Sequence, residues 1–207
     1  MSYRFAFALS ALIAAPLLAQ DAPAPAPASQ LVRVAFDTDA GRIVIDVDKG
    51  RAPITAGNFL RYVDAGRYNG ESFYRAMPYT EGEGLIQGGI TTDAAKLYPT
   101  IKHEPTSVTG LKHLAGTVSV ARGAPGTARA DFFILTTDIP GFDADPAREG
   151  DNAGYAAFGQ LVEGMDVVRK IFAGPRSATK GEGALKGQML EPVVKIRKVS
   201  RVTAAAK

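Results

Sequence analysis

The chain has 207 residues, of which 46% are hydrophobic and 22% charged, values typical of a globular domain with a sizeable core. Its 24 basic and 21 acidic residues are interspersed and give a net charge of +3, so the sequence indicates no nucleic-acid partner. The chain contains no cysteine, which excludes disulfides, thiolate nucleophiles and cysteine metal ligands.

The first thirty residues differ in composition from the rest of the chain. Arg4 is followed by an uncharged, mostly apolar stretch that ends at Ala19 and would be about 22 Å long as a helix, short of the ~30 Å hydrocarbon core. This pattern predicts a cleavable signal peptide over residues 1–19 and an extended Ala/Pro-rich linker over residues 20–30. We therefore expect a periplasmic or secreted protein, with no stable membrane insertion after cleavage.

A folded domain is predicted over residues 31–203. Apolar and polar residues alternate over 31–37 and again over 42–47, which indicates a hairpin with one core face. Pro53 then marks the first turn of a helix that Gly66 ends. Its apolar residues follow helical spacing: Ala56, Phe59, Leu60 and Val63.

The middle and end of the domain contain short strand-like segments separated by turns. A second helix is predicted from residue 163 or 164 to Gly174, a glycine-rich loop over 175–191, and a last strand over 193–202. Two other long loops, 90–113 and 138–154, have the length of functional loops. The pattern indicates a mainly β, antiparallel barrel capped by helices. The other predicted strands are 71–77, 84–88, 116–121, 131–137 and 155–162.

The segment from Phe73 to Gly89 places an arginine and a glutamine on two neighbouring strands. Side chains alternate along a strand, so residues 73, 75 and 77 share one face, as do Leu85 and Gln87. If the strands pair, Arg75, Leu85 and Gln87 meet on one surface. An arginine supported by an amide beside an apolar contact suits the backbone and ring of a proline-containing polypeptide.

Six sequence blocks, in order, resemble the cyclophilin-type peptidyl-prolyl isomerases, and the likeness runs from about Val32 to Val202. The resemblance implies a closed eight-stranded antiparallel β-barrel capped by two α-helices, with a proline-binding groove on its outer face. The blocks are Pro-Ile-Thr-Ala-Gly-Asn-Phe (53–59), Phe-Tyr-Arg (73–75), Leu-Ile-Gln-Gly-Gly (85–89), Gly-Thr-Val-Ser-Val-Ala-Arg (116–122), Asp-Phe-Phe-Ile (131–134) and Phe-Gly-Gln-Leu-Val-Glu-Gly-Met-Asp-Val-Val (158–168).

The resemblance implies catalytic roles for Arg75 and Gln87. The chain departs from the family at the rim of the groove, where Gly84 replaces a phenylalanine and Gly141 or Phe142 replaces a tryptophan. Arg122, Asp131 and Tyr155 stand at positions of an asparagine, a glutamine and a histidine. The substrate-binding residues expected from the resemblance are Leu85, Ala121, Arg122, Asp131, Phe133, Phe142 and Tyr155.

The two charged departures have opposite signs and lie at the ends of strands that should pair. We therefore expect Arg122 and Asp131 to form a partly exposed ion pair that leaves Arg75 unneutralised. In the competing arrangement, Asp131 pairs with Arg75 itself and reduces activity.

The leading hypothesis is an exported, monomeric peptidyl-prolyl cis-trans isomerase that assists protein folding in the periplasm by stabilising the twisted X-Pro amide. This chemistry needs no cofactor, metal, acid, base or nucleophile. One alternative is a weakly or non-catalytic module that binds proline peptides; another is a barrel with a small apolar ligand inside. His103 and His113 are expected to be solvated loop residues, and a Ser119–His113–Asp131 triad lacks a nucleophile-elbow sequence.

Overall fold

The computed structural model describes residues 28–91 and 93–202. The predicted signal peptide, most of the linker and residue 203 therefore lie outside the described residues. In the part of the chain that is described, no helix is long and apolar enough to cross a membrane.

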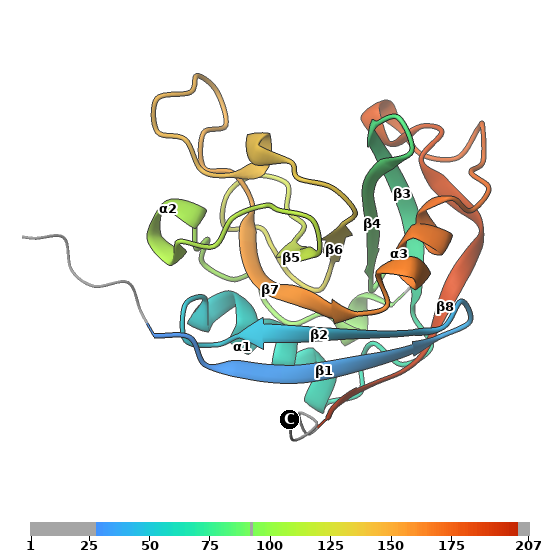
Figure 1. Ribbon diagram of the computed structural model, residues 1–207, viewed down its shortest axis with the longest axis horizontal. Coiled ribbons are helices and arrows are strands. Elements are labelled where there is room, and N and C mark those ends of the chain that lie inside the picture. The colour runs from blue at the N-terminus through green and yellow to red at the C-terminus, as the bar shows by residue number, and fades with distance from the viewer. Residues whose placement is uncertain (1–27, 92, 203–207) are drawn as a thin grey trace, which may run out of the picture.

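Eight strands form a closed antiparallel barrel, in the order β1-β2-β7-β5-β6-β4-β3-β8 (Figure 1). This confirms the predicted fold class. The last strand begins four residues earlier than predicted, since it pairs with β3 as well as with β1 and so closes the barrel. The strands are β1 Leu31–Thr38, β2 Arg42–Asp48, β3 Ser72–Thr80, β4 Glu83–Gly89, β5 Thr117–Val120, β6 Phe132–Leu135, β7 Ala156–Glu163 and β8 Met189–Arg201.

Helices α1 (Pro53–Asp64) and α3 (Met165–Phe172) are the two that the sequence predicts. Helix α1 packs on β2, β7 and β8, whereas α3 packs on β2, β3 and β4, and the two lie toward opposite ends of β2 (Figure 1). A third helix, α2 (Thr106–Thr109), is a single turn inside the predicted 90–113 loop.

Side chains fill the inside of the barrel. The rings of Phe36, Phe59, Phe73 and Phe132 are buried and lie within 6.3 Å of one another in successive pairs. Phe36, Phe73 and Phe132 point inward from strands, and Phe59 of α1 packs on them from one end of the barrel, so side chains fill the interior as expected for a barrel of this size. The interior therefore has no room for the apolar ligand of the third hypothesis.

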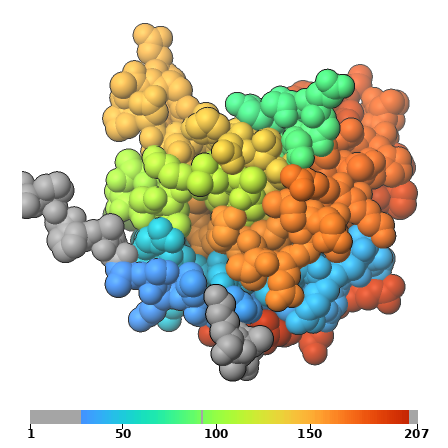
Figure 2. Space-filling view, in the orientation of Figure 1, coloured from blue at the N-terminus to red at the C-terminus, as the bar shows by residue number. Residues whose placement is uncertain are grey.

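Two segments project at one edge of the molecule. Figure 2 shows the 138–154 loop projecting from the body, and the tip of the β3–β4 hairpin lies at the same edge. The loop includes a short 3-10 turn, Pro140–Phe142, which places Phe142 beside the barrel wall.

Candidate active site

The pairing of β3 with β4 brings the predicted catalytic residues together. Arg75 lies opposite Gln87, and Met77 lies opposite Leu85, so these side chains share one surface as predicted. Phe73 does not share it: the register shifts between Phe73 and Arg75, and Phe73 points into the core. A β-bulge at Tyr74 adds one residue to the strand, and this reverses the alternation that the sequence predicted.

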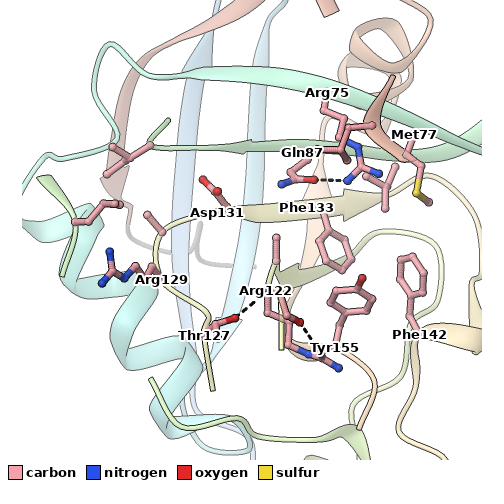
Figure 3. A pocket seen from close by; sticks show the side chains of 17 residues that line it. Arg75, Met77, Gln87, Arg122, Thr127, Arg129, Asp131, Phe133, Phe142 and Tyr155 are labelled. Carbon is pink, nitrogen blue, oxygen red and sulfur yellow. Dashed lines mark hydrogen bonds between the residues drawn. The ribbon is translucent and has the colours of Figure 1, made fainter. Parts of the chain in front are cut away.

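Outward-facing side chains of β3, β4 and β6, with Ala121 and Arg122 just after β5, form one side of a pocket of about 380 Å³ (Figure 3). Tyr155, just before β7, and Phe142 of the 138–154 loop form the other side. All nine site residues predicted from the sequence line this pocket: Arg75, Leu85, Gln87, Ala121, Arg122, Asp131, Phe133, Phe142 and Tyr155.

Two neutral amides hold the Arg75 guanidinium. Its Nη1 donates to Gln87 Oε1 at 2.6 Å, and its Nε donates to Gln188 Oε1 at 2.8 Å. The Gln87 side chain is fixed in turn, because its Nε2 donates to the Tyr74 hydroxyl at 2.7 Å. Burial lowers the pKa of Arg75, and none of the ion pairs among the described residues includes it. The positive charge is therefore oriented but not neutralised.

Aromatic rings form an apolar recess beside this guanidinium. Phe133 meets Phe142 at 5.7 Å and Tyr155 at 5.3 Å between ring centroids, both nearly edge-on, and Phe142 lies 4.7 Å from Tyr155. In Figure 3 these three rings lie on the same side of the pocket as Met77. Such a recess accepts a small apolar ring while leaving the arginine within reach of its backbone.

His113 and Ser119 lie beneath this recess, contrary to the expectation of a solvated histidine. His113 is 1% exposed, and its ring nitrogens contact Asp143 Oδ1 at 2.8 Å and Ser119 Oγ at 3.0 Å. The acidic member of the network is Asp143, not Asp131. Because Ser119 is completely buried, the network presents no accessible nucleophile, and it ties the 138–154 loop to the barrel.

The predicted Arg122–Asp131 ion pair is wrong. Arg122 instead binds Asp151 through two hydrogen bonds of 2.7 and 2.9 Å, and its Nε donates to the Gly154 carbonyl at 2.9 Å. Asp151 and Gly154 belong to the 138–154 loop, which folds back over the end of β5. The competing Asp131–Arg75 pair is not formed either, since Arg75 binds the two amides.

Asp131 is instead a carboxylate without an ion-pair partner among the described residues. Its Oδ1 is buried with no hydrogen-bond partner there, and it lies where a Cβ on Gly89 would approach to 1.9 Å. Burial raises the pKa of Asp131 to about 6, although the nearby Tyr74 hydroxyl and Ile90 N–H oppose this shift. The pocket therefore contains a carboxyl group whose pKa is raised to about 6.

Comparisons with known proteins identify the family to which this site belongs. Residues 33–201 match the family described as cyclophilin type peptidyl-prolyl cis-trans isomerase/CLD. The chain belongs to this family. It is 33% identical over 170 residues to peptidyl-prolyl cis-trans isomerase A of Dickeya dadantii, covering 81% of this chain and 83% of that protein. It is 38% identical over 144 residues to isomerase B of Escherichia coli, covering 67% and 82%.

Solved structures of cyclophilins share the fold. A cyclophilin type isomerase from Cryptosporidium parvum superposes with a TM-score of 0.64 at 20% identity, covering 84% of this chain and 99% of that one. A second structure of the same protein, determined in the presence of the dipeptide Ala-Pro, gives a TM-score of 0.63.

The structure also explains why this cyclophilin has glycine at position 84. A Cβ at Gly84 would lie 2.0 Å from the Met77 carbonyl oxygen and 2.9 Å from the Phe172 ring. The close approach of β3 and α3 therefore excludes a phenylalanine here. Met77, on the facing strand, packs against the cluster that contains Leu85 and Phe133 and supplies apolar surface on this side of the groove.

Several contributors to the site were not identified as such from the sequence, among them Tyr74, Met77, Leu185 and Gln188. Tyr74 was assigned no role because the bulge that directs it toward Gln87 has no signal in the alternation pattern. Gln188 and Leu185 come from the glycine-rich loop, more than a hundred positions from Arg75. Met77 was placed on the correct face but given no role, and its position two residues after Arg75 was a usable signal.

Proposed function

We propose that the protein catalyses cis-trans isomerisation of X-Pro bonds in polypeptides, with Arg75 as the catalytic residue. The observation that carries the proposal is a guanidinium held by two neutral amides beside a recess of three aromatic rings. The related Cryptosporidium structure determined in the presence of the dipeptide Ala-Pro supports the same class of ligand.

The physical basis of the reaction is the loss of amide resonance on rotation. The barrier is near 20 kcal/mol, and uncatalysed exchange takes tens of seconds. In the twisted state the prolyl nitrogen becomes pyramidal and basic, so an N–H donor beside it stabilises that state more than either planar isomer. In this arrangement Arg75 supplies the donor, Gln87 orients it, and Phe133, Phe142 and Leu85 hold the ring.

An exchange measurement on a short Ala-Pro peptide tests this function. The protein at catalytic concentration should accelerate cis-trans exchange, and the acceleration should saturate as peptide is added. Binding without any acceleration would instead identify a peptide-binding module that has kept the cyclophilin groove but lost catalysis.

We further infer that the enzyme acts on folding proteins in the periplasm after export. The support is the apolar, uncharged segment that ends at Ala19 and the Ala/Pro-rich segment that follows it. A substrate protein whose refolding is limited by proline isomerisation should refold faster in the presence of the mature enzyme, and a matched substrate without proline-limited phases should not.

The export proposal predicts the N-terminus of the mature protein. When the full-length gene product is expressed with an intact secretion system, the purified protein should begin near Gln20 or Asp21. Intact-mass measurement checks this directly. A mass equal to that of all 207 residues would show that the segment is retained and would contradict cleavage.

A further inference from the structure

The glycine-rich loop between α3 and β8, residues 173–188, folds over the catalytic arginine. Its far end is fixed to β3 by the backbone, since Ala76 N donates to the Gln188 carbonyl at 2.9 Å and Arg75 pairs with Met189. The loop is therefore anchored at the residue next to Arg75.

Internal contacts give this loop a defined shape. Gly187 N donates to the Lys180 carbonyl at 3.1 Å, and Gln188 N donates to the Leu185 carbonyl at 3.1 Å. Gly181 has a positive φ of 92°, and a Cβ there would lie 2.3 Å from the Leu185 carbonyl oxygen. Glycine is needed at this position because the backbone crosses itself so closely. The tip of the loop is thus a closed turn.

The Gln188 side chain is held at both ends. Its Nε2 donates to the Ala184 carbonyl at 2.8 Å, and its Oε1 accepts from Arg75 Nε at 2.8 Å. The first bond fixes which end of the amide faces Arg75, because only the NH₂ group donates to a carbonyl. With Gln87 binding Nη1, the two acceptors fix the guanidinium plane and leave Nη2 without a partner among the described residues.

The same loop also contributes to the pocket wall. Leu185 lines the pocket together with Arg75 and Met77, although its side chain is 41% exposed. A large apolar side chain that stays exposed beside a binding groove is available to contact a ligand.

We propose that this loop is part of the active site: Gln188 is a positioning residue that sets the plane of the Arg75 guanidinium, and Leu185 contacts an apolar substrate side chain next to the proline. The proposal rests on the proposed isomerase function. Beyond Arg75 and Gln87, the active site then includes a second amide, from Gln188, and a contact that sets substrate preference, from Leu185. Both residues come from a loop that is distant from Arg75 in sequence.

The test replaces Gln188 with methionine, which keeps the length of the side chain but removes both hydrogen bonds. For Gln188→Met we expect kcat/KM on an Ala-Pro peptide to fall about tenfold, mainly through kcat. The NMR signal of the Arg75 Nε–H should shift, because that proton loses its acceptor. The Ala76 amide should stay protected from hydrogen exchange, which shows that the loop remains docked through the backbone.

A matched control makes the same change elsewhere. Gln160 on β7 donates from Nε2 to the Ala115 carbonyl at 2.9 Å and lies outside the pocket, so Gln160→Met should leave both the rate and the Arg75 signal unchanged. An unchanged Arg75 Nε–H signal in Gln188→Met would overturn the positioning role whether or not the wild type is active. Lost protection of Ala76 would assign the effect to loop undocking and would also overturn it.

Leu185→Ala tests the second part of the proposal. The KM for peptides with a leucine or phenylalanine next to the proline should rise about fivefold, whereas the KM for peptides with glycine there should not change. Equal KM values for wild type and variant across this peptide pair would refute the contact. A wild type inactive on every peptide would refute the proposed function instead.

Discussion

Replacing Arg75 with alanine should lower kcat/KM for X-Pro isomerisation by about 100-fold or more, ~3 kcal/mol of transition-state stabilisation. The reason is that Arg75 is the cationic donor held beside the aromatic recess, by Gln87 at 2.6 Å and Gln188 at 2.8 Å. Folding should change little, since Arg75 forms no ion pair among the described residues and its amide partners border the groove. Exchange kinetics and thermal unfolding of the same preparations measure both quantities.

Two further variants separate charge from geometry. Arg75→Lys keeps the positive charge, but an ammonium group lacks the planar fork that meets two amides and a substrate together, so most activity should be lost. Arg42→Ala removes a charge from the exposed pair with Asp37, outside the pocket, and should leave the rate unchanged. Equal rates for wild type and Arg75→Ala would eliminate the proposed mechanism.

The spacing of apolar residues predicted most of the fold, because an element that buries one face has apolar residues at regular intervals along its sequence. The β1–β2 hairpin and α1 matched closely, since their apolar residues follow spacings of two and of three to four over whole elements. The start of β8 was predicted late. Its first residues pair with β3 at the edge of the groove, and their burial alternates weakly.

The site was predictable where its residues lie on regular strands. Asp131 and Phe133 face the groove while Phe132 and Ile134 face the core, as alternation required. The bulge at Tyr74 was not predictable, because one extra residue reverses alternation without any marker in the sequence.

Loop contacts were also beyond the reach of sequence patterns. The partner of Arg122 is Asp151, in a loop whose path no periodicity determines, and the second amide on Arg75 comes from another such loop. The predicted Arg122–Asp131 pair assumed that two opposite charges near the ends of neighbouring strands must contact each other. The loops instead supplied a partner for Arg122 and left Asp131 without one.

Burial of the Asp131 carboxylate should lower the stability of the fold at neutral pH. Burial raises the pKa of Asp131 to about 6, above its ordinary value of 3.8, so the folded state holds this proton more tightly than the unfolded state does. Asp131 contributes its full stabilisation of the fold below pH ~4, where it is protonated in both states. This contribution falls as the pH rises from ~4 to ~6 and is lost above pH ~6. A difference of about two pKa units corresponds to about 3 kcal/mol, an upper value for a partly buried group.

Asp131→Asn should therefore raise the free energy of unfolding by about 2 to 3 kcal/mol at pH 8 and by much less at pH 4. The amide has nearly the shape of the carboxyl and remains uncharged at both pH values, so it removes the cost of burying the anion. Denaturant unfolding of wild type and variant at the two pH values measures the difference.

Asp151→Asn provides the control of opposite sign. Hydrogen bonds from the Arg122 guanidinium hold the pKa of Asp151 below its ordinary value of 3.8. The ionised Asp151 therefore stabilises the fold at pH values above 3.8, and this stabilisation is lost as the pH falls through its lowered pKa. The Asp151 variant should be less stable than wild type at pH 8, and this difference should shrink as the pH falls below 3.8. A gain for Asp131→Asn that is the same at pH 4 and pH 8 would show that packing, not ionisation, governs the site. A lower stability of Asp131→Asn than of wild type at pH 8 would show that the groove stabilises the Asp131 anion, although its Oδ1 has no hydrogen-bond partner among the described residues.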